Sequence, residues 1–173
     1  MSNQTKKVLI IRHGEKPGEP GDENAVDGPD LSPRGHVRAA ALAKHFVNEF
    51  GRPDFIFATA GTKHSNRPVQ TIKPLARETG IEINAKHADD EFQKVAREIL
   101  DNTKYSGKLI LICWHHGKIP KLTAALGGIS PEEKWDEKVF DRIWQLEIPH
   151  SSSETKVTVV NAPQMLLFGD SKS

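Results

Sequence analysis

The chain has 173 residues, a length typical of one domain that buries roughly two-thirds of its unfolded surface, so we expect residues 1–173 to form a single domain. Its 24 basic and 23 acidic residues leave a formal net charge of +1, which argues against nucleic acid or a membrane as a partner. The single cysteine excludes an internal disulfide. The polar N-terminus precedes only a short apolar stretch, so we expect neither a signal peptide nor a membrane span, and a cytoplasmic location.

Short apolar runs alternate with helical patterns along the first 128 residues. Three runs, too short for helices and without polar alternation, predict buried strands at 8–11, 55–58 and 109–113. Strands that alternate with helices favour a parallel sheet.

The helical patterns lie between and after these runs. The first begins at Ser32-Pro33, an N-cap followed by a proline, and ends at Gly51. The second spans about 66–79 and contains Pro74, which should kink or split it. A third follows Asp89, and a fourth follows the last of the three strands and stops at Gly127-Gly128.

The pattern changes near the C-terminus. Residues 143–148 and 156–160 predict two strands joined by the polar loop 149–154, and Ser130-Pro131-Glu132-Glu133 fits the capping box of a short helix before them. We therefore expect an α/β fold: a mostly parallel sheet with helices on both faces, to which a C-terminal hairpin adds an antiparallel part.

The segment from Gly14 to Asp30 is rich in glycine, proline and acidic residues. Its spacing does not match a calcium-binding loop, so a solvated, flexible loop is the expected structure. If the loop covered a site, its acidic residues would disfavour highly anionic substrates.

Several residues suited to chemistry follow directly after the predicted strands. Arg12 and His13 follow the first strand, Arg67 lies near the helix start after the second, and His116 follows the third. Open α/β sheets bind ligands beyond the carboxyl ends of their strands, so we expect these side chains to face one crevice. A nucleophilic imidazole with two guanidiniums and a second histidine suits phosphoryl transfer, in which charge spreads over three oxygens.

These residues occur within a larger ordered set, which resembles the histidine phosphatase superfamily, a group that includes phosphoglycerate mutase-like enzymes. The set comprises Arg12-His13-Gly14, Leu31-Ser32-Pro33-Arg34-Gly35 with Ala39, Arg67 with Gln70-Thr71 and Pro74-Leu75-Ala76, and His116-Gly117. The resemblance implies a phosphohistidine intermediate at His13 and a phosphate pocket of Arg12, His13, Arg67 and His116. It also implies a mixed α/β fold without a metal or other cofactor.

The resemblance favours a phosphatase acting on a phosphorylated small molecule or a phosphoprotein. Glu15-Lys16-Pro17 follow the first motif, where mutase-like members usually carry a small hydroxyl residue and, further on, an asparagine. Two alternatives stay open: a phosphate-recognising binding module with little turnover, and a mutase-like phosphotransferase. The sequence makes no prediction of the oligomeric state.

Three carboxylates are candidate proton donors to the leaving group. The tripeptide Asp89-Asp90-Glu91 lies about where the family often places this acid, and Asp90 and Glu91 are the candidates there. Capping of the next helix is the alternative role for them. Glu15 is a third candidate, which could instead pair with Lys16 or orient Arg12.

The pair His115-His116 suggests a metal site, but adjacent residues in an extended segment point opposite ways, and no further cysteine or histidine has ligand spacing. We therefore expect no metal, and we expect His115 to be packed or at the rim of the pocket.

Overall fold

The computed structural model describes residues 5–19, 21–149 and 156–171. Within them the chain forms a sheet of six strands in the order β3-β2-β4-β1-β5-β6. The strands are β1 (Lys6–Arg12), β2 (Phe55–Ala58), β3 (Ile83–Asn84), β4 (Leu109–Trp114), β5 (Arg142–Ile148) and β6 (Thr158–Pro163). The first four are parallel to one another, whereas β5 is antiparallel to both β1 and β6. The predicted α/β fold class is thus confirmed, including its antiparallel C-terminal hairpin.

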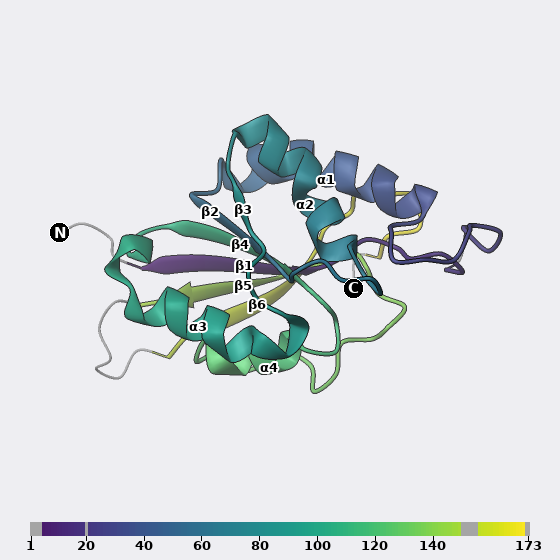
Figure 1. The fold of residues 1–173 in the computed structure, drawn as a ribbon. Coiled ribbons are helices and arrows are strands. Elements are labelled where there is room, and N and C mark those ends of the chain that lie inside the picture. Colours follow the sequence, from purple (N-terminus) through teal and green to yellow (C-terminus); the bar gives the residue numbers. More distant parts are fainter. Residues whose placement is uncertain (1–4, 20, 150–155, 172–173) are drawn as a thin grey trace.

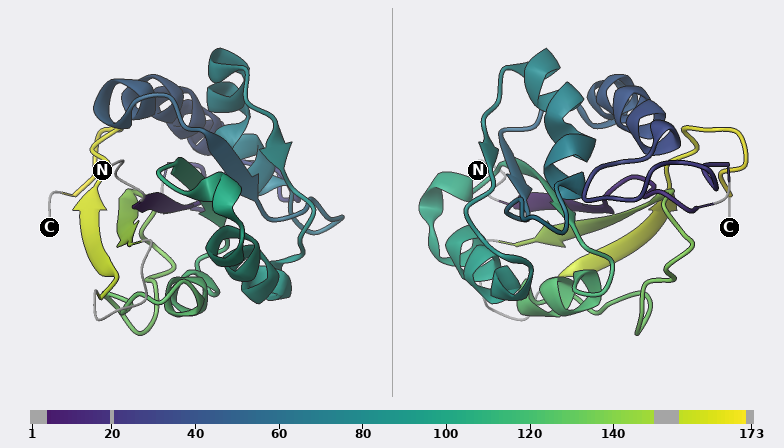
Figure 2. Two further views of the ribbon diagram at one scale, coloured as in Figure 1. Left: turned by 90° about the vertical axis from the view of Figure 1, so that its left-hand side faces the viewer. Right: turned by 45° about the vertical axis from the view of Figure 1, so that its right-hand side comes forward.

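Helices cover both faces of the sheet (Figures 1 and 2). Helices α1 (Pro33–Phe50) and α2 (Arg67–Thr79) lie on one face, and α3 (Phe92–Asp101) and α4 (Ile119–Ala125) lie on the other. Alternate residues of β1 serve the two sides: Leu9 and Ile11 pack with α1 and α2, while Val8 and Ile10 pack with α3 and α4. This division explains why the central strands read as unbroken apolar runs.

The centre of the sheet is formed by β1, β4 and β2. Cys113, the only cysteine, is fully buried in β4 and is paired with Ile11 of β1 on one side and Ala58 of β2 on the other. Neighbouring strands therefore shield its thiol on both sides within the sheet.

The helix boundaries follow the expected signals. The Ser32 hydroxyl accepts the Gly35 N–H at 3.1 Å at the start of α1, and Gly51, with φ of 86°, ends that helix. Helix α2 continues through Pro74, so a split is wrong. Proline removes one backbone donor from the helix, and the buried neighbours Ile72 and Leu75 keep this segment packed on the sheet.

The segment before β5 differs from the expectation. No helix forms at residues 130–133: the Ser130 hydroxyl donates to the Glu132 carbonyl instead of capping a helix start. Two residues later Trp135 is buried against Trp144, with ring centroids 5.0 Å apart, and this packing draws the segment into the core.

The C-terminal hairpin is shifted from its predicted position. Strand β6 begins two residues later and ends three residues later than the predicted strand 156–160, and most of the loop 149–154 lies outside the described residues. Two-residue β3 has no counterpart among the predicted strands. None of the described helices combines the length and apolar character needed to cross a membrane.

Candidate active site

A cavity of about 410 Å³ lies at the carboxyl ends of β1, β2 and β4. Its walls include the four residues expected to face one crevice: Arg12, His13, Arg67 and His116. His115, expected to be packed or at the rim, and Asp89, which was not a candidate, line it as well. These side chains come from four separate stretches of the chain, brought together because the parallel strands end at the same edge.

The ring of His13 is fixed by its own backbone. Its Nδ1 lies 2.7 Å from the Gly14 carbonyl, which can only accept, so Nδ1 carries the proton and Nε2 keeps its lone pair. Burial lowers the pKa of His13 well below its ordinary value, and the charge of Arg12 lowers it further. The imidazole is therefore neutral at physiological pH and has one nucleophilic nitrogen.

The loop after His13 is packed closely against α1 and α2. The Gly14 N–H donates to Thr71 Oγ1 at 2.8 Å, and the Thr71 hydroxyl donates to the Arg67 carbonyl at 2.8 Å. A Cβ on Gly35 would lie 2.4 Å from the Glu15 carbonyl oxygen, so only glycine fits at the start of α1. This close approach explains a glycine in the motif that begins at Leu31, and the Gly14–Thr71 hydrogen bond ties α2 to the nucleophile loop.

Two guanidiniums border the cavity. Arg12 is 1% exposed; it lies over the Phe140 ring, with Cζ 3.7 Å from the centroid, and donates to the carbonyls of Glu137 and, at 3.1 Å, of Val139. Arg67 donates from Nη1 to the Gly28 carbonyl at 3.0 Å. The Nε of each arginine is buried and has no hydrogen-bond partner within the described residues. Burial lowers the pKa of Arg12 to about 10, so it stays charged and can bind an anion.

Both adjacent histidines line the cavity, but only His115 contacts His13. Their rings meet edge to face with centroids 5.1 Å apart. Strand β4 ends at Trp114 and the Lys118 N–H returns to the His115 carbonyl at 3.0 Å, so the chain turns here and the expected alternation no longer applies. Burial lowers the pKa of His115 to about 4 and also lowers that of His116, whose buried Nδ1 has no partner in the described part of the chain.

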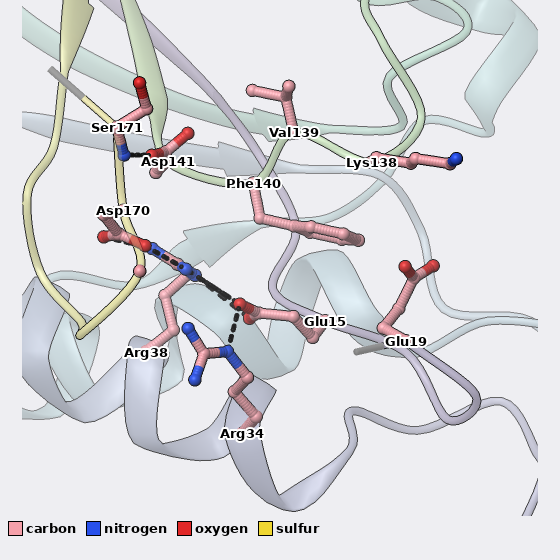
Figure 3. A pocket seen from close by; sticks show the side chains of 11 residues that line it. Glu15, Glu19, Arg34, Arg38, Lys138, Val139, Phe140, Asp141, Asp170 and Ser171 are labelled. Carbon is pink, nitrogen blue, oxygen red and sulfur yellow. Dashed lines mark hydrogen bonds and ion pairs between the residues drawn. The ribbon is translucent and has the colours of Figure 1, made fainter. Parts of the chain in front are cut away.

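Glu15 points away from this cavity. Its carboxylate lines a second cavity of about 260 Å³, where it accepts from Arg38 Nε at 3.0 Å and Nη2 at 2.8 Å, and from Arg34 Nε at 3.3 Å (Figure 3). Arg38 also binds both carboxylate oxygens of Asp170 at 2.8 and 3.0 Å. Lys16 lies 3.8 Å from Glu19 instead of pairing with Glu15. Glu15 therefore lies outside the cavity that holds His13 and is not placed to reach a leaving group there.

The acids before α3 differ in their surroundings. Asp90 is exposed, and Glu91 accepts the Ala88 N–H at 2.9 Å and pairs with Lys94, as a capping residue would. Asp89, in contrast, lines the cavity: its Oδ1 is buried with no partner in the described chain, and burial raises its pKa. Asp89 was not among the expected proton donors, because the turn of the chain, which the sequence pattern does not show, decides which acid faces inward.

Across the described residues, no group of three or more histidine, cysteine, aspartate or glutamate side chains is placed to hold a metal ion. The groups that the cavity offers to a ligand include imidazole, guanidinium and carboxyl, together with the Lys16 ammonium and the hydroxyls of Thr59 and Ser65.

The fold is similar to that of several solved phosphatases, among them a protein histidine phosphatase. The protein histidine phosphatase SixA, in a structure with tungstate, is similar with a TM-score of 0.62 and 13% identity, covering 91% of this chain and 97% of that one. Phosphoserine phosphatase from Entamoeba histolytica, in complex with 3-phosphoglyceric acid, is similar with a TM-score of 0.61 and 18% identity, covering 93% of this chain and 99% of that one.

A mycobacterial glucosyl-3-phosphoglycerate phosphatase is similar with a TM-score of 0.56 and 15% identity, covering 83% of this chain and 90% of that one. No protein-family model matches the sequence, and no curated protein matches it. At these identities the similarity establishes the fold alone.

Proposed function

We propose that this chain is a metal-independent phosphatase that hydrolyses a phosphomonoester or a phosphoprotein through a phosphohistidine at His13. The observation that carries the proposal is the fixed tautomer of His13: a neutral imidazole with a free Nε2 in a cavity bordered by Arg12 and Arg67. Phosphatase activity in proteins of the same fold supports it.

In the first step His13 Nε2 attacks phosphorus in line, an N–P bond forms and the bond to the leaving oxygen breaks. Arg12 and Arg67 stabilise the charge on the equatorial oxygens. Asp89, whose burial favours the protonated carboxyl, gives its proton to the leaving oxygen. In the second step Asp89 accepts a proton from water, which attacks phosphorus and releases phosphate and free His13.

We assign the second histidine of the phosphate pocket to His115 as well as to His116. The ring of His115 is in edge contact with His13, whereas His116 borders the cavity without contacting that ring in any described interaction. His115 would fix the plane of the nucleophile, and His116 would bind a phosphoryl oxygen or the leaving group.

The test is to mix the purified protein with a phosphorus-labelled aryl phosphate in the presence of a chelator and to quench the reaction in alkali. We expect an acid-labile, alkali-stable label on His13 and its loss, together with turnover, in His13→Ala. Near-normal turnover by His13→Ala would overturn the covalent mechanism. Phosphate binding without label or turnover would instead favour a binding module, and transfer of label to an added alcohol in preference to water would favour a phosphotransferase.

A further inference from the structure

The cavity at His13, called the phosphate cavity from here on, shares lining residues with a larger neighbouring cavity. A cavity of about 740 Å³ lies between the start of α4 and the segment 133–137, and His116 and Gly117 line both cavities. Arg12, which lines the phosphate cavity, donates to the carbonyl of Glu137, which lines the larger one. The two cavities are thus linked both by shared lining residues and by this hydrogen bond between their walls.

From this connection we infer that the leaving group of the substrate occupies the larger cavity and is a bulky, uncharged group; the inference rests on the phosphatase activity proposed above. A volume of about 740 Å³ lies within the range of roughly 300–1,000 Å³ typical of small-molecule sites. A methyl or glyceryl group would leave most of it to water, so the size favours an alcohol that carries at least one ring.

The lining of this cavity sets the charge of the group it accepts. Pro120 and the buried Trp135 supply apolar surface, which favours apolar parts of a ligand. The charged residues around them are of both signs: Lys121, Lys134, Glu133, Asp136 and Glu137. Because three acids offset the two lysines, the wall offers no net attraction to a second phosphate or carboxylate, so an uncharged group fits better.

A second cavity beside the phosphate cavity fits a leaving group less well. It has a volume of about 310 Å³ and is lined mostly by charged side chains, among them Lys16, Asp27 and Lys63, with Pro29 as its only apolar side chain. It is less than half the size and offers little apolar contact.

Two glycines allow the larger and the smaller neighbouring cavity to be filled separately by substitution. Gly117 lines the phosphate cavity and the larger one, and Gly28 lines the smaller one. A Cβ added at either position meets no atom within 4 Å, and neither residue has the positive φ that would strain a side chain. Gly117→Leu and Gly28→Leu are therefore a matched pair of variants.

The experiment compares kcat/KM for phenyl phosphate and 2-naphthyl phosphate, whose leaving groups differ in size but little in acidity. We expect the unmodified protein to prefer the naphthyl ester about tenfold, as burial of a second ring implies. Gly117→Leu should remove most of this preference, whereas Gly28→Leu should keep it. The ratio of the two esters cancels any general loss of activity.

Equal kcat/KM for the two esters in the unmodified protein would overturn the inference, as would loss of the preference in Gly28→Leu but not in Gly117→Leu. If the unmodified protein hydrolyses neither ester, the proposed function fails. The subsite is then tested by calorimetric binding of 2-naphthyl phosphate: weaker binding only in Gly117→Leu supports it, and unchanged binding overturns it.

Discussion

His13 and His115 occupy equivalent positions at the ends of two adjacent parallel strands. Each follows directly after a member of the pair Arg12–Trp114, the last pair in the β1–β4 register, and their rings meet at an interplanar angle of 71°. The sequence motif contains two adjacent histidines and does not indicate which of them contacts the nucleophile. The β1–β4 register shows that His115 does.

The register predicts unequal effects of substituting the two histidines. His115→Asn should lower the rate of His13 phosphorylation by a factor of about 100 or more, because the nucleophile loses its edge contact and its orientation. His116→Asn should lower it by a factor of about 10 or less, since no described contact joins that ring to His13. Rapid-quench measurement of the phosphoenzyme distinguishes them, and a reversed order would refute the assignment of His115.

Asp89 and Asp90 form a matched pair for testing the proton donor. Asp89→Asn should lower kcat for an alkyl phosphate by about 10²- to 10⁴-fold and affect an ester with an acidic phenol much less, because only the alkoxide needs a proton. Asp90→Asn should leave both rates near normal, as its side chain is exposed. Equal losses for the two esters in Asp89→Asn would contradict a donor role.

Arg67 should bind the phosphoryl group directly. Loss of a charge-assisted hydrogen bond in Arg67→Ala should raise the inhibition constant for inorganic phosphate about 10- to 100-fold and lower kcat/KM with it. Arg77→Ala, an exposed arginine in the last turn of the same helix, controls for charge and helix stability. Similar inhibition constants for the two variants would count against direct contact.

Arg38 links the nucleophile loop to the C-terminal segment. It is 3% exposed and lies between Glu15 and Asp170 (Figure 3). Arg38→Met leaves two carboxylates without their main cation and should lower the free energy of unfolding by about 3 kcal/mol. Arg34→Met, at a more exposed partner of Glu15, should cost about 1 kcal/mol or less. Urea denaturation measures both changes. Equal losses of unfolding free energy would show that the buried ion pairs of Arg38 stabilise the fold no more than the more exposed one of Arg34 does.

The buried histidines make stability depend on pH. The folded protein holds the pKa of His115 at about 4, below the value of about 6.5 expected when the chain is unfolded, and the pKa of His13 is lowered as well. Between these values the unfolded chain binds more protons, so the free energy of unfolding should fall as the pH falls from about 6.5 to 4, by up to about 1.4 kcal/mol per pH unit for each such histidine.

His115→Gln should make this dependence shallower, and His36→Gln, at an exposed position of α1, should not. Denaturation curves at pH 7, 6 and 5 provide the comparison. An unchanged slope in His115→Gln would mean that this ring does not resist protonation in the folded state.

Much of the fold could be predicted because its signals are local. The central strands are unbroken apolar runs, and α1 begins where a serine precedes a proline. The location of the cavity followed from the rule that parallel strands present their carboxyl ends at one edge.

What could not be predicted depends on turns and long-range packing. Whether Asp89 or Asp90 faces the cavity is decided by a single 3₁₀ turn, and the chain reversal after Trp114 places His115 and His116 on the same side. The helix expected at residues 130–133 is displaced by the burial of Trp135 against a strand that lies further along the chain.

The position of Cys113 supplies a natural reporter of unfolding. Burial raises the pKa of its thiol, and β4 is hydrogen-bonded to a neighbour along each edge, so an alkylating reagent gains access only when the centre of the sheet separates. The rate of alkylation under native conditions thus measures how often the centre of the sheet opens, without any engineered label. By the same reasoning, reagents that inactivate cysteine-dependent phosphatases should leave the folded protein unmodified.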